Sequence, residues 1–297
     1  MTGFRDCIVR SRLILVVILL VSISCWAKRV MRDQLGREVM LPELPHRLVC
    51  LAPSITDAVY SLGAGDDVVG VTDYSKYPSE AAQKPSVGAL VTPSVEAIVA
   101  LHPDLVLAVG DFNPTEIGTK LEHMSVPVFF VTPRGIAGIY SSIGILGKVL
   151  HREQAADALV ARLRVREQAI RARVSGKPVS RVFFPVWVDP VITVGKNAFI
   201  TDLISAAGAR SITDDLSPDW PQISLETVVA RQPESLLLIR GSQITIADLR
   251  KKTIWKDLKC VQQSRVFYVD ERIYSPSPVA FDALEELANQ LHPVGER

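Results

Sequence analysis

A stretch of sequence that occurs twice is the feature that most restricts how this chain can fold. The first copy runs from Ser94 to Asp104 and the second from Ser224 to Glu234; each has Ser-x-Glu, then apolar residues, then a Pro seven residues after the Glu. Each copy predicts a short amphipathic helix that opens at the Ser, with the Glu in its first turn. The Pro ends the helix, and the apolar run after it predicts a buried strand. Copies that lie 130 residues apart indicate two lobes built alike.

Glu96 and Glu226 occupy the same place in the two copies. One interpretation is that both carboxylates only stabilise their helices, since an acid suits the positive end of the helix dipole. The other is that two equivalent acidic helix starts, one on each lobe, form a matched pair of docking points for a partner. Both interpretations stay open at this stage.

The N-terminus has the pattern of a secretory signal. Arg5, Arg10 and Arg12 precede an apolar run over residues 13–23. That run is too short to span a bilayer comfortably, and it suits the core of a cleavable signal. We therefore assign residues 1–27 to a signal peptide and expect a periplasmic or secreted product. A lipoprotein with its anchor at Cys25 is the alternative.

The composition fits an exported globular chain. Of the 297 residues, 48% are hydrophobic and 22% are charged, so the chain can bury a large core and wholesale disorder is unexpected. Without residues 1–27 the chain is close to neutral, which argues against a nucleic-acid partner. Two cysteines remain, Cys50 and Cys260, and we expect both to be buried and unpaired because they fall in different lobes.

Short β-branched runs alternate with helical patterns, which predicts an α/β fold of two Rossmann-like lobes with mostly parallel sheets. The predicted strands cover residues 48–51, 68–71, 105–109 and 128–131 in the first lobe and 182–188, 192–194, 235–239 and 266–269 in the second. We place the N-terminal lobe at 28–150, a connecting helix at 151–176 and the C-terminal lobe at 177–297. The helix is predicted over Glu153–Val174, which contains neither Pro nor Gly and would be about 33 Å long.

Aromatic residues recur in the loops that follow the predicted strands, where ligands of such sheets bind. These residues are Tyr74, Phe112, Trp187, Trp220 and Tyr274. The loop after the first strand adds Pro53 and Ser54 to the expected ligand contacts, with Ser54 or Thr56 as a helix cap. Each ring alone could equally seal the edge of a core. Together they favour a cleft between the lobes for a large, flat, partly apolar ligand.

Several segments, taken in order and spacing, resemble the substrate-binding proteins of ABC importers. The segments that carry the resemblance are Arg47–Ser54, Leu62–Gly65, Gly70–Pro78, the two Glu repeats, Phe199–Gly208 and Asp282–Ala288. They cover essentially the whole chain after residue 27. The class that they resemble has a single long helix between its lobes and takes up cobalamin, ferric siderophores or haem.

Within that class the chain is most similar to the periplasmic cobalamin-binding proteins. The resemblance implies that Tyr74 and Trp220 contact the corrin ring, and Trp187 falls near the position of a further aromatic in the second lobe of that family. It also implies that Glu96 and Glu226 meet arginines on a membrane permease. Cobalamin would be the transported ligand rather than a cofactor. The alternative ligand is haem or a ferric siderophore, with Tyr74 as a candidate iron ligand.

The chain also departs from the cobalamin-binding pattern. Gly88–Leu90 and Val109–Phe112 stand where that family has two first-lobe tryptophans, and Val279 stands where the wider class often has Arg. These departures leave the exact ligand open between the corrinoid and the other metal chelates. They do not affect the class.

An α/β enzyme is the alternative from a different class. The sequence contains no G-x-S-x-G, no G-x-G-x-x-G and no P-loop. The five histidines are scattered without the spacing of metal ligands; they are His46, His102, His123, His151 and His292. We therefore predict a binding protein with no catalytic residues and no bound metal.

Overall fold

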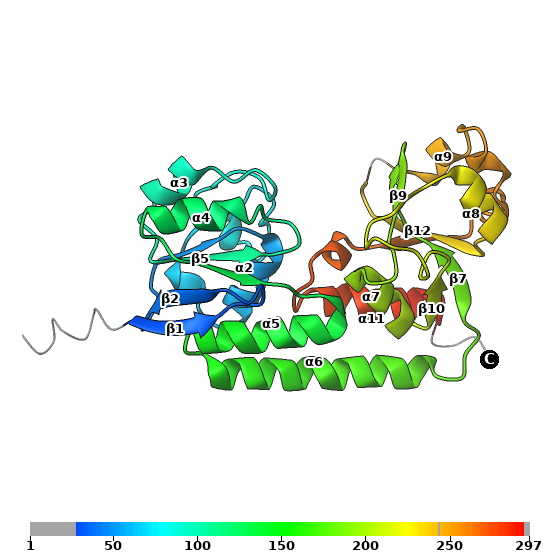
Figure 1. Ribbon diagram of the computed structural model, residues 1–297. Coiled ribbons are helices and arrows are strands. Elements are labelled where there is room, and N and C mark those ends of the chain that lie inside the picture. The colour runs from blue at the N-terminus through cyan, green and yellow to red at the C-terminus, as the bar shows by residue number, and fades with distance from the viewer. Residues whose placement is uncertain (1–27, 243, 294–297) are drawn as a thin grey trace, which may run out of the picture. The chain divides into compact units, whose positions relative to one another are not determined.

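The computed structural model describes residues 28–242 and 244–293, so the predicted signal peptide and the Cys25 alternative lie outside the described residues. The chain divides into two compact units (Figure 1). Unit 1 holds the described residues up to Ala52, together with Asp66–Tyr74 and Gln83–Val131. Unit 2 holds Pro53–Gly65, Ser75–Ala82 and the described residues from Thr132 on.

Unit 1 is built on a four-stranded parallel sheet in the order β4-β3-β5-β6. The strands are β3 (Leu48–Cys50), β4 (Val68–Val71), β5 (Leu105–Val109) and β6 (Val128–Val131). Three of them have the predicted bounds, and β3 ends one residue earlier than predicted. Nearly all of their residues are buried, as expected for parallel strands that read as continuous apolar runs.

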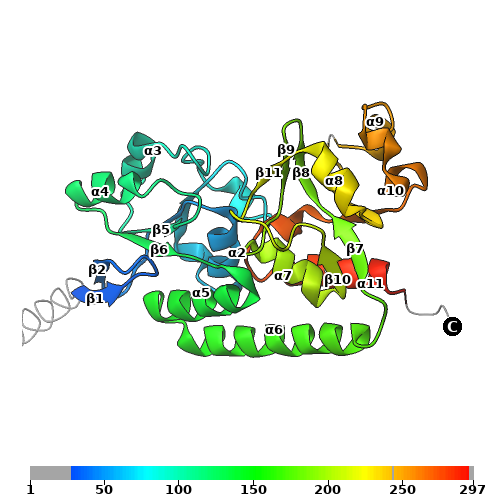
Figure 2. The same cartoon turned by 45° about the vertical axis from the view of Figure 1, so that its right-hand side comes forward.

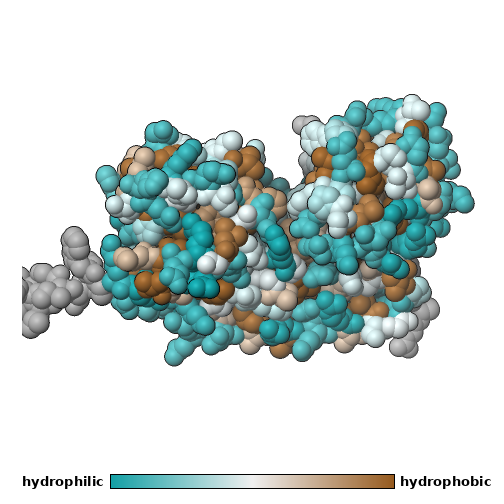
Figure 3. Space-filling view, viewed as in Figure 1, coloured by the Kyte–Doolittle hydropathy of each residue, from teal (hydrophilic) through white to brown (hydrophobic). Residues whose placement is uncertain are grey.

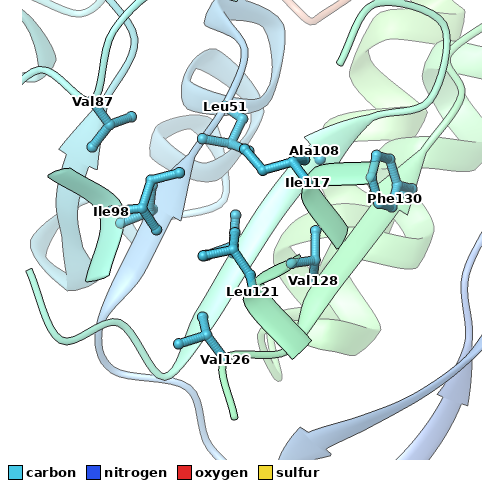
Figure 4. Packing of buried hydrophobic residues seen from close by; sticks show 11 residues of the cluster. Leu51, Val87, Ile98, Ala108, Ile117, Leu121, Val126, Val128 and Phe130 are labelled. Atoms are coloured by element: carbon cyan, nitrogen blue, oxygen red, sulfur yellow. The ribbon is translucent and has the colours of Figure 1, made fainter. Parts of the chain in front are cut away.

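Two helices cover one face of this sheet: α3 (Val95–Ala100) and α4 (Glu116–His123). Ile98 of α3 and Leu121 of α4 pack with Val106, Val128 and Phe130 of the strands, all in one buried cluster (Figure 4). The apolar side chains of each short helix therefore lie against the sheet, and its polar side chains, Glu96 among them, face solvent.

A β-hairpin that the sequence did not predict precedes the sheet. It consists of β1 (Lys28–Arg32) and β2 (Glu38–Pro42) in antiparallel register. At its turn the buried Asp33 carboxylate accepts the backbone N–H of Arg37 at 2.9 Å. The Arg37 guanidinium donates to the carbonyl oxygen of Val128 at 2.6 Å and lies 4.6 Å from the centre of the Phe130 ring. The hairpin is thereby fixed to the edge strand β6, which it covers in part.

Unit 2 repeats the sheet of unit 1. Its parallel strands are β7 (Ser180–Phe183), β10 (Ala209–Ser211), β12 (Ser235–Ile239) and β13 (Val266–Val269). Their order is β10-β7-β12-β13, so the second strand of each unit lies at one edge, the first and third lie inside, and the fourth lies at the other edge. The shared strand order confirms the α/β fold of two similar parallel sheets that the sequence repeat indicates.

The single strand predicted over residues 182–188 is wrong. The structure forms two strands there, β7 and β8 (Pro185–Val188), and β8 belongs to a separate antiparallel sheet in the order β11-β9-β8, with β9 (Val191–Thr193) and β11 (Gln222–Ile223). Pro185 has no backbone N–H to continue the ladder of β7, which gives a physical reason for the break. Strands β10 and β11 were also missed.

Unit 2 also contains most of the helices that the structure describes. They are α2 (Pro53–Ser61), α5 (Gly135–Val149), α6 (Glu153–Val174), α7 (Phe199–Ala206), α8 (Leu225–Arg231), α9 (Ile246–Leu249), α10 (Lys259–Gln262) and α11 (Ala280–Leu291). Short 3-10 turns lie at η1 (Gly65–Asp67), η2 (Ala81–Gln83), η3 (Trp255–Asp257) and η4 (Glu271–Tyr274). Helix α6 has the predicted bounds and lies beside α5 (Figures 1 and 2).

Cys50 in β3 and Cys260 in α10 are both buried, and neither forms a disulfide. Burial raises the pKa of the Cys260 thiol, which makes the thiolate scarce and the group inert. On the face shown in Figure 3, hydrophilic residues predominate on the surface of each unit, with apolar residues in scattered patches. Among the helices that the structure describes, none has both the length and the apolar composition needed to cross a membrane.

Candidate functional site

The strand order of unit 1 marks where a ligand would bind. In the sheet, β4 lies on one side of β3 and β5 lies on the other side. The strand order therefore reverses between β3 and β5, and the loops after these two strands lie on either side of that point. Phe112 follows β5 and is half-buried, whereas Pro53 follows β3 in the chain and begins α2. Pro53 suits this first helical position because its missing N–H needs no partner there. Ser54 and Thr56 lie inside the helix, so the expectation that either caps it is wrong.

Asn113 holds the loops at this switch point and was not selected from the sequence. Its side-chain oxygen accepts the backbone N–H of Val109 at 2.6 Å, and its side-chain nitrogen donates to the carbonyl oxygens of Leu51 at 2.9 Å and Leu90 at 2.7 Å. The side chain is only 4% exposed, so these bonds are shielded from water. Asn113 therefore ties together the segments at Leu51, Leu90 and Val109, next to Phe112 in the chain.

Tyr74 is the most exposed large apolar side chain of the loops in unit 1, with 64% of its surface accessible. Its neighbour Asp73 fixes the backbone: the Asp73 N–H donates to the carbonyl oxygen of Gly88 at 3.1 Å, and the Ser86 hydroxyl donates to the Asp73 carboxylate. Gly88 has a φ of +96°, and a Cβ there would lie 3.2 Å from the carbonyl oxygen of Thr92. A tryptophan at Gly88 would therefore be strained.

In unit 2 the structure brings Trp187 and Trp220 onto one small sheet. Trp187 lies within β8, is 57% exposed, and donates its indole N–H to the carbonyl oxygen of Asp189 at 2.8 Å. Trp220 lies just before β11, half-buried, with its ring edge-on to Phe199 at 6.4 Å between centroids. Strand β9 separates β8 from β11. The expectation that both lie in loops after strands is wrong, because Trp187 lies within β8 and Trp220 precedes β11.

Tyr274, the fifth aromatic of the predicted set, seals a core edge. Its ring lies edge-on to the buried Phe184, 5.8 Å between centroids, and burial raises the pKa of Tyr274 to about 12. Tyr274 is 38% exposed, less than either Tyr74 or Trp187. Tyr274 is a weaker candidate for ligand contact than Tyr74 or Trp187.

A buried carboxyl in α2 is bonded to the segment before α11, and sequence reasoning missed this contact. Asp57 is 5% exposed; the Ser275 hydroxyl donates to its Oδ2 at 2.7 Å and the Ser277 hydroxyl at 3.0 Å. Burial raises the pKa of Asp57 to about 6, and the two hydroxyl bonds oppose the rise without cancelling it.

The raised pKa of Asp57 predicts a stability that falls as pH rises. A carboxyl with a folded-state pKa of about 6 and a reference value of 3.8 favours folding most below the reference value, and this contribution is lost as pH rises through 6. We expect the free energy of unfolding, measured with urea, to fall by about 1 kcal/mol between pH 5 and pH 7. Asp57→Asn should remove that part of the dependence. An equal fall in the variant would contradict this account.

The two Glu repeats form the helices that the sequence predicts. Ser94 accepts the backbone N–H of Ala97 at 3.1 Å, and Ser224 accepts that of Thr227 at 3.2 Å, so each Ser caps its helix. Glu96 and Glu226 both follow their cap by two residues and are exposed. Bonds from its own backbone N–H and from the Ser224 hydroxyl hold the pKa of Glu226 below its usual value.

The far ends of α3 and α8 are also held alike. The Arg47 guanidinium donates to the carbonyl oxygen of Leu101 at 2.7 Å, and the Arg181 guanidinium donates to that of Arg231 at 2.6 Å. In both copies the residue before the Pro has a φ of +46°. Each Glu therefore lies in a short helix that a Ser side chain caps at its start and an Arg guanidinium holds at its end.

The part of the chain that the structure describes contains no cluster of metal-ligating side chains. Within residues 28–242 and 244–293, no three side chains of His, Cys, Asp or Glu gather closely enough to hold an ion. The features that stand out are exposed aromatic rings and paired acidic helix starts.

The sequence pattern of a family described as "periplasmic binding protein" matches residues 48–273. Two curated relatives match most of the chain. The uncharacterized ABC transporter substrate-binding lipoprotein YvrC of Bacillus subtilis is 29% identical, over 88% of this chain and 84% of that protein. The vitamin B12-binding protein of Pectobacterium carotovorum is 29% identical, over 84% of this chain and 89% of that protein.

Solved structures share the fold. The vitamin B12-binding protein BtuF of Vibrio cholerae superposes with a TM-score of 0.71 at 25% identity, over 83% of this chain and 96% of that one. A periplasmic haem-binding protein of Pseudomonas aeruginosa superposes with a TM-score of 0.78 at 23% identity, over 85% of this chain and 95% of that one. The fold is thus shared by proteins named for two different large ligands.

Proposed function

The chain belongs to the periplasmic binding protein family, and from this premise we propose that it captures a corrinoid and delivers it to the permease of an ABC importer. Members of this family act outside the cytoplasm as binding components of transport systems, so the chain is not an enzyme. The observation that carries the corrinoid proposal is the 29% identity with a vitamin B12-binding protein over most of both chains.

The described aromatic side chains support a large, flat, partly apolar ligand. Tyr74 and Trp187 leave more than half of their surfaces accessible, so each offers ring area that a ligand can cover. We propose that these two rings, with Trp220 and Phe112, contact the corrin ring. Pro53 and Ser54 at the start of α2 complete the proposed contacts.

Uptake in cells tests the proposed function. A strain that lacks this chain should accumulate much less labelled cobalamin from a dilute medium, and expression of the chain should restore accumulation. Uptake of an unrelated solute by the same cells is the control. Unchanged cobalamin accumulation in the deletion strain, with no other cobalamin receptor present, would contradict the proposal.

Haem is the second candidate ligand, and the fold shared with a haem-binding protein favours it. The Tyr74 phenol is exposed and could supply an oxygen to haem iron. In that case haemin binding should shift the Soret band, and Tyr74→Phe should abolish the shift. A corrinoid held by ring contacts predicts that Tyr74→Phe keeps most of its affinity.

We propose that Glu96 and Glu226 dock the protein onto the permease. Each is exposed in the first turn of a helix that a Ser caps at its start and an Arg holds at its end. Arginines of the permease could form two-pronged bonds with such carboxylates, and these bonds fix orientation as well as attract. Two separate contacts of this kind would hold the receptor in one orientation over the pore.

We propose that export removes residues 1–27, with a lipid anchor at Cys25 as the alternative, and that the lobes cover 28–150 and 177–297 about the helix at 151–176. The intact mass of the exported protein separates the two forms of the N-terminus. A chain that begins at Lys28 supports simple cleavage. A diacylated mass that begins at Cys25 would support the anchor.

A further inference from the structure

One segment of unit 2, residues 248–265, concentrates positive charge. Its exposed cations are Arg250, Lys251, Lys252, Lys256, Lys259 and Arg265. The same segment carries two carboxylates, Asp248 and Asp257, and Asp248 lies 3.8 Å from the Lys251 ammonium. Outside this basic segment, the chain after residue 27 has more carboxylates than lysines and arginines. The positive charge is therefore local.

The basic segment has a fixed conformation. Trp255 and Leu258 are buried and anchor it in the core of unit 2. The Arg250 guanidinium donates to the carbonyl oxygens of Val261 and Gln262, each at 3.4 Å, and so ties the start of the segment to its end. The cations are therefore displayed on a folded surface.

The basic segment lies next to α8, the helix that carries Glu226 in its first turn. Val228 of α8 belongs to the same buried cluster as Trp255 and Leu258, and Figure 2 shows α8, α9 and α10 at the same end of unit 2. A contact that brings Glu226 to a protein in the membrane would also bring these cations close to the surrounding lipid.

We propose that the basic segment binds the surface of a bilayer that contains anionic phospholipids. Lysine ammonium groups are flexible, strongly hydrated point charges, which suit a diffuse layer of lipid phosphates better than a shaped pocket. Nucleic acid fits less well, because the ring of the segment's aromatic residue, Trp255, is buried and no base could stack on it. The inference rests on the proposed function only for its membrane setting and does not depend on which ligand is carried.

Vesicle binding tests the inference. The exported protein, purified without detergent, is mixed with vesicles of phosphatidylglycerol and phosphatidylcholine or of phosphatidylcholine alone, and the bound fraction is measured by sedimentation. We expect binding to the anionic vesicles only, weakened by added salt. The triple variant Lys251→Gln, Lys252→Gln, Lys256→Gln should bind about 100-fold more weakly.

A matched control variant distinguishes the effect of the basic segment from the effect of overall net charge. Lys120→Gln, Arg152→Gln and Arg162→Gln together remove the same charge from exposed positions on α4, before α6 and on α6, and should leave vesicle binding within about twofold of the parent. Equal losses in the two triple variants, or no binding of the parent to anionic vesicles, would overturn the proposal. If the parent fails to bind vesicles but the first triple variant docks poorly to the permease in detergent, the basic segment binds a protein partner instead of lipid. Failure of cobalamin binding would leave these results unaffected.

Discussion

Replacing Glu96 and Glu226 together with alanine is expected to abolish ligand uptake while ligand binding stays normal. Loss of one carboxylate at a buried Arg–carboxylate contact can cost a few kcal/mol of docking, because the partner charge is left unpaired. With both contacts removed, the receptor should no longer hold its orientation on the permease. The double variant is assayed for thermal unfolding, ligand binding and uptake in the same preparation.

A matched control separates docking from helix capping. Ser94→Ala and Ser224→Ala remove the hydroxyls that accept the helix N–H groups and also bond to Glu96 and Glu226, but both carboxylates remain in the chain. They should each cost about 1 kcal/mol of stability and leave uptake intact. If the glutamate variant keeps normal uptake and only its melting temperature falls, the carboxylates serve the caps alone.

Removing an exposed indole ring is expected to weaken ligand binding strongly. Trp187→Ala and Trp220→Ala should each cost about 1–3 kcal/mol of binding free energy, by analogy with other aromatic platforms for flat rings. Trp187 is the cleaner test, because 57% of its surface is exposed and its loss should disturb the fold little. Trp220→Phe keeps an apolar ring beside Phe199 and should retain part of the affinity lost in Trp220→Ala.

Tyr268→Ala is the matched control for these changes. Tyr268 lies on β13 of the same unit and is 38% exposed, but it is not among the proposed ligand contacts. Its removal should leave the dissociation constant unchanged. Equal losses of affinity in Tyr268→Ala and Trp187→Ala would indicate a general effect on unit 2 and would remove the support for ring stacking.

The parts of the fold that the sequence predicted well are those with local signals. Strands β4, β5, β6, β12 and β13 have the predicted bounds because each is a short apolar run between polar residues. Helix α6 was predicted over the right residues because a stretch free of Pro and Gly ends at Gly176 and Pro178. The Ser caps of α3 and α8 were predicted from the sequence repeat.

The parts that were missed depend on contacts between distant residues or on a weak local pattern. The apolar run at 182–188 continues through the break between β7 and β8, so hydrophobicity alone could not show that Pro185 starts a new sheet. The bond between Asp57 and Ser277 joins residues 220 positions apart, and no spacing in the sequence points to it. Asn113 was visible as a polar residue after a strand, but its three bonds appear only when the loops are folded.

Titration calorimetry of the exported protein with cyanocobalamin, haemin and a ferric chelate is the most direct test of the central claim. The account predicts tight, saturable binding of the corrinoid at one site per chain, weakened in Trp187→Ala, and much weaker binding of the other two compounds. The account would be contradicted by the absence of heat with cyanocobalamin together with tight haemin binding and a Soret shift that Tyr74→Phe abolishes. That result would show that the ligand of the protein is haem.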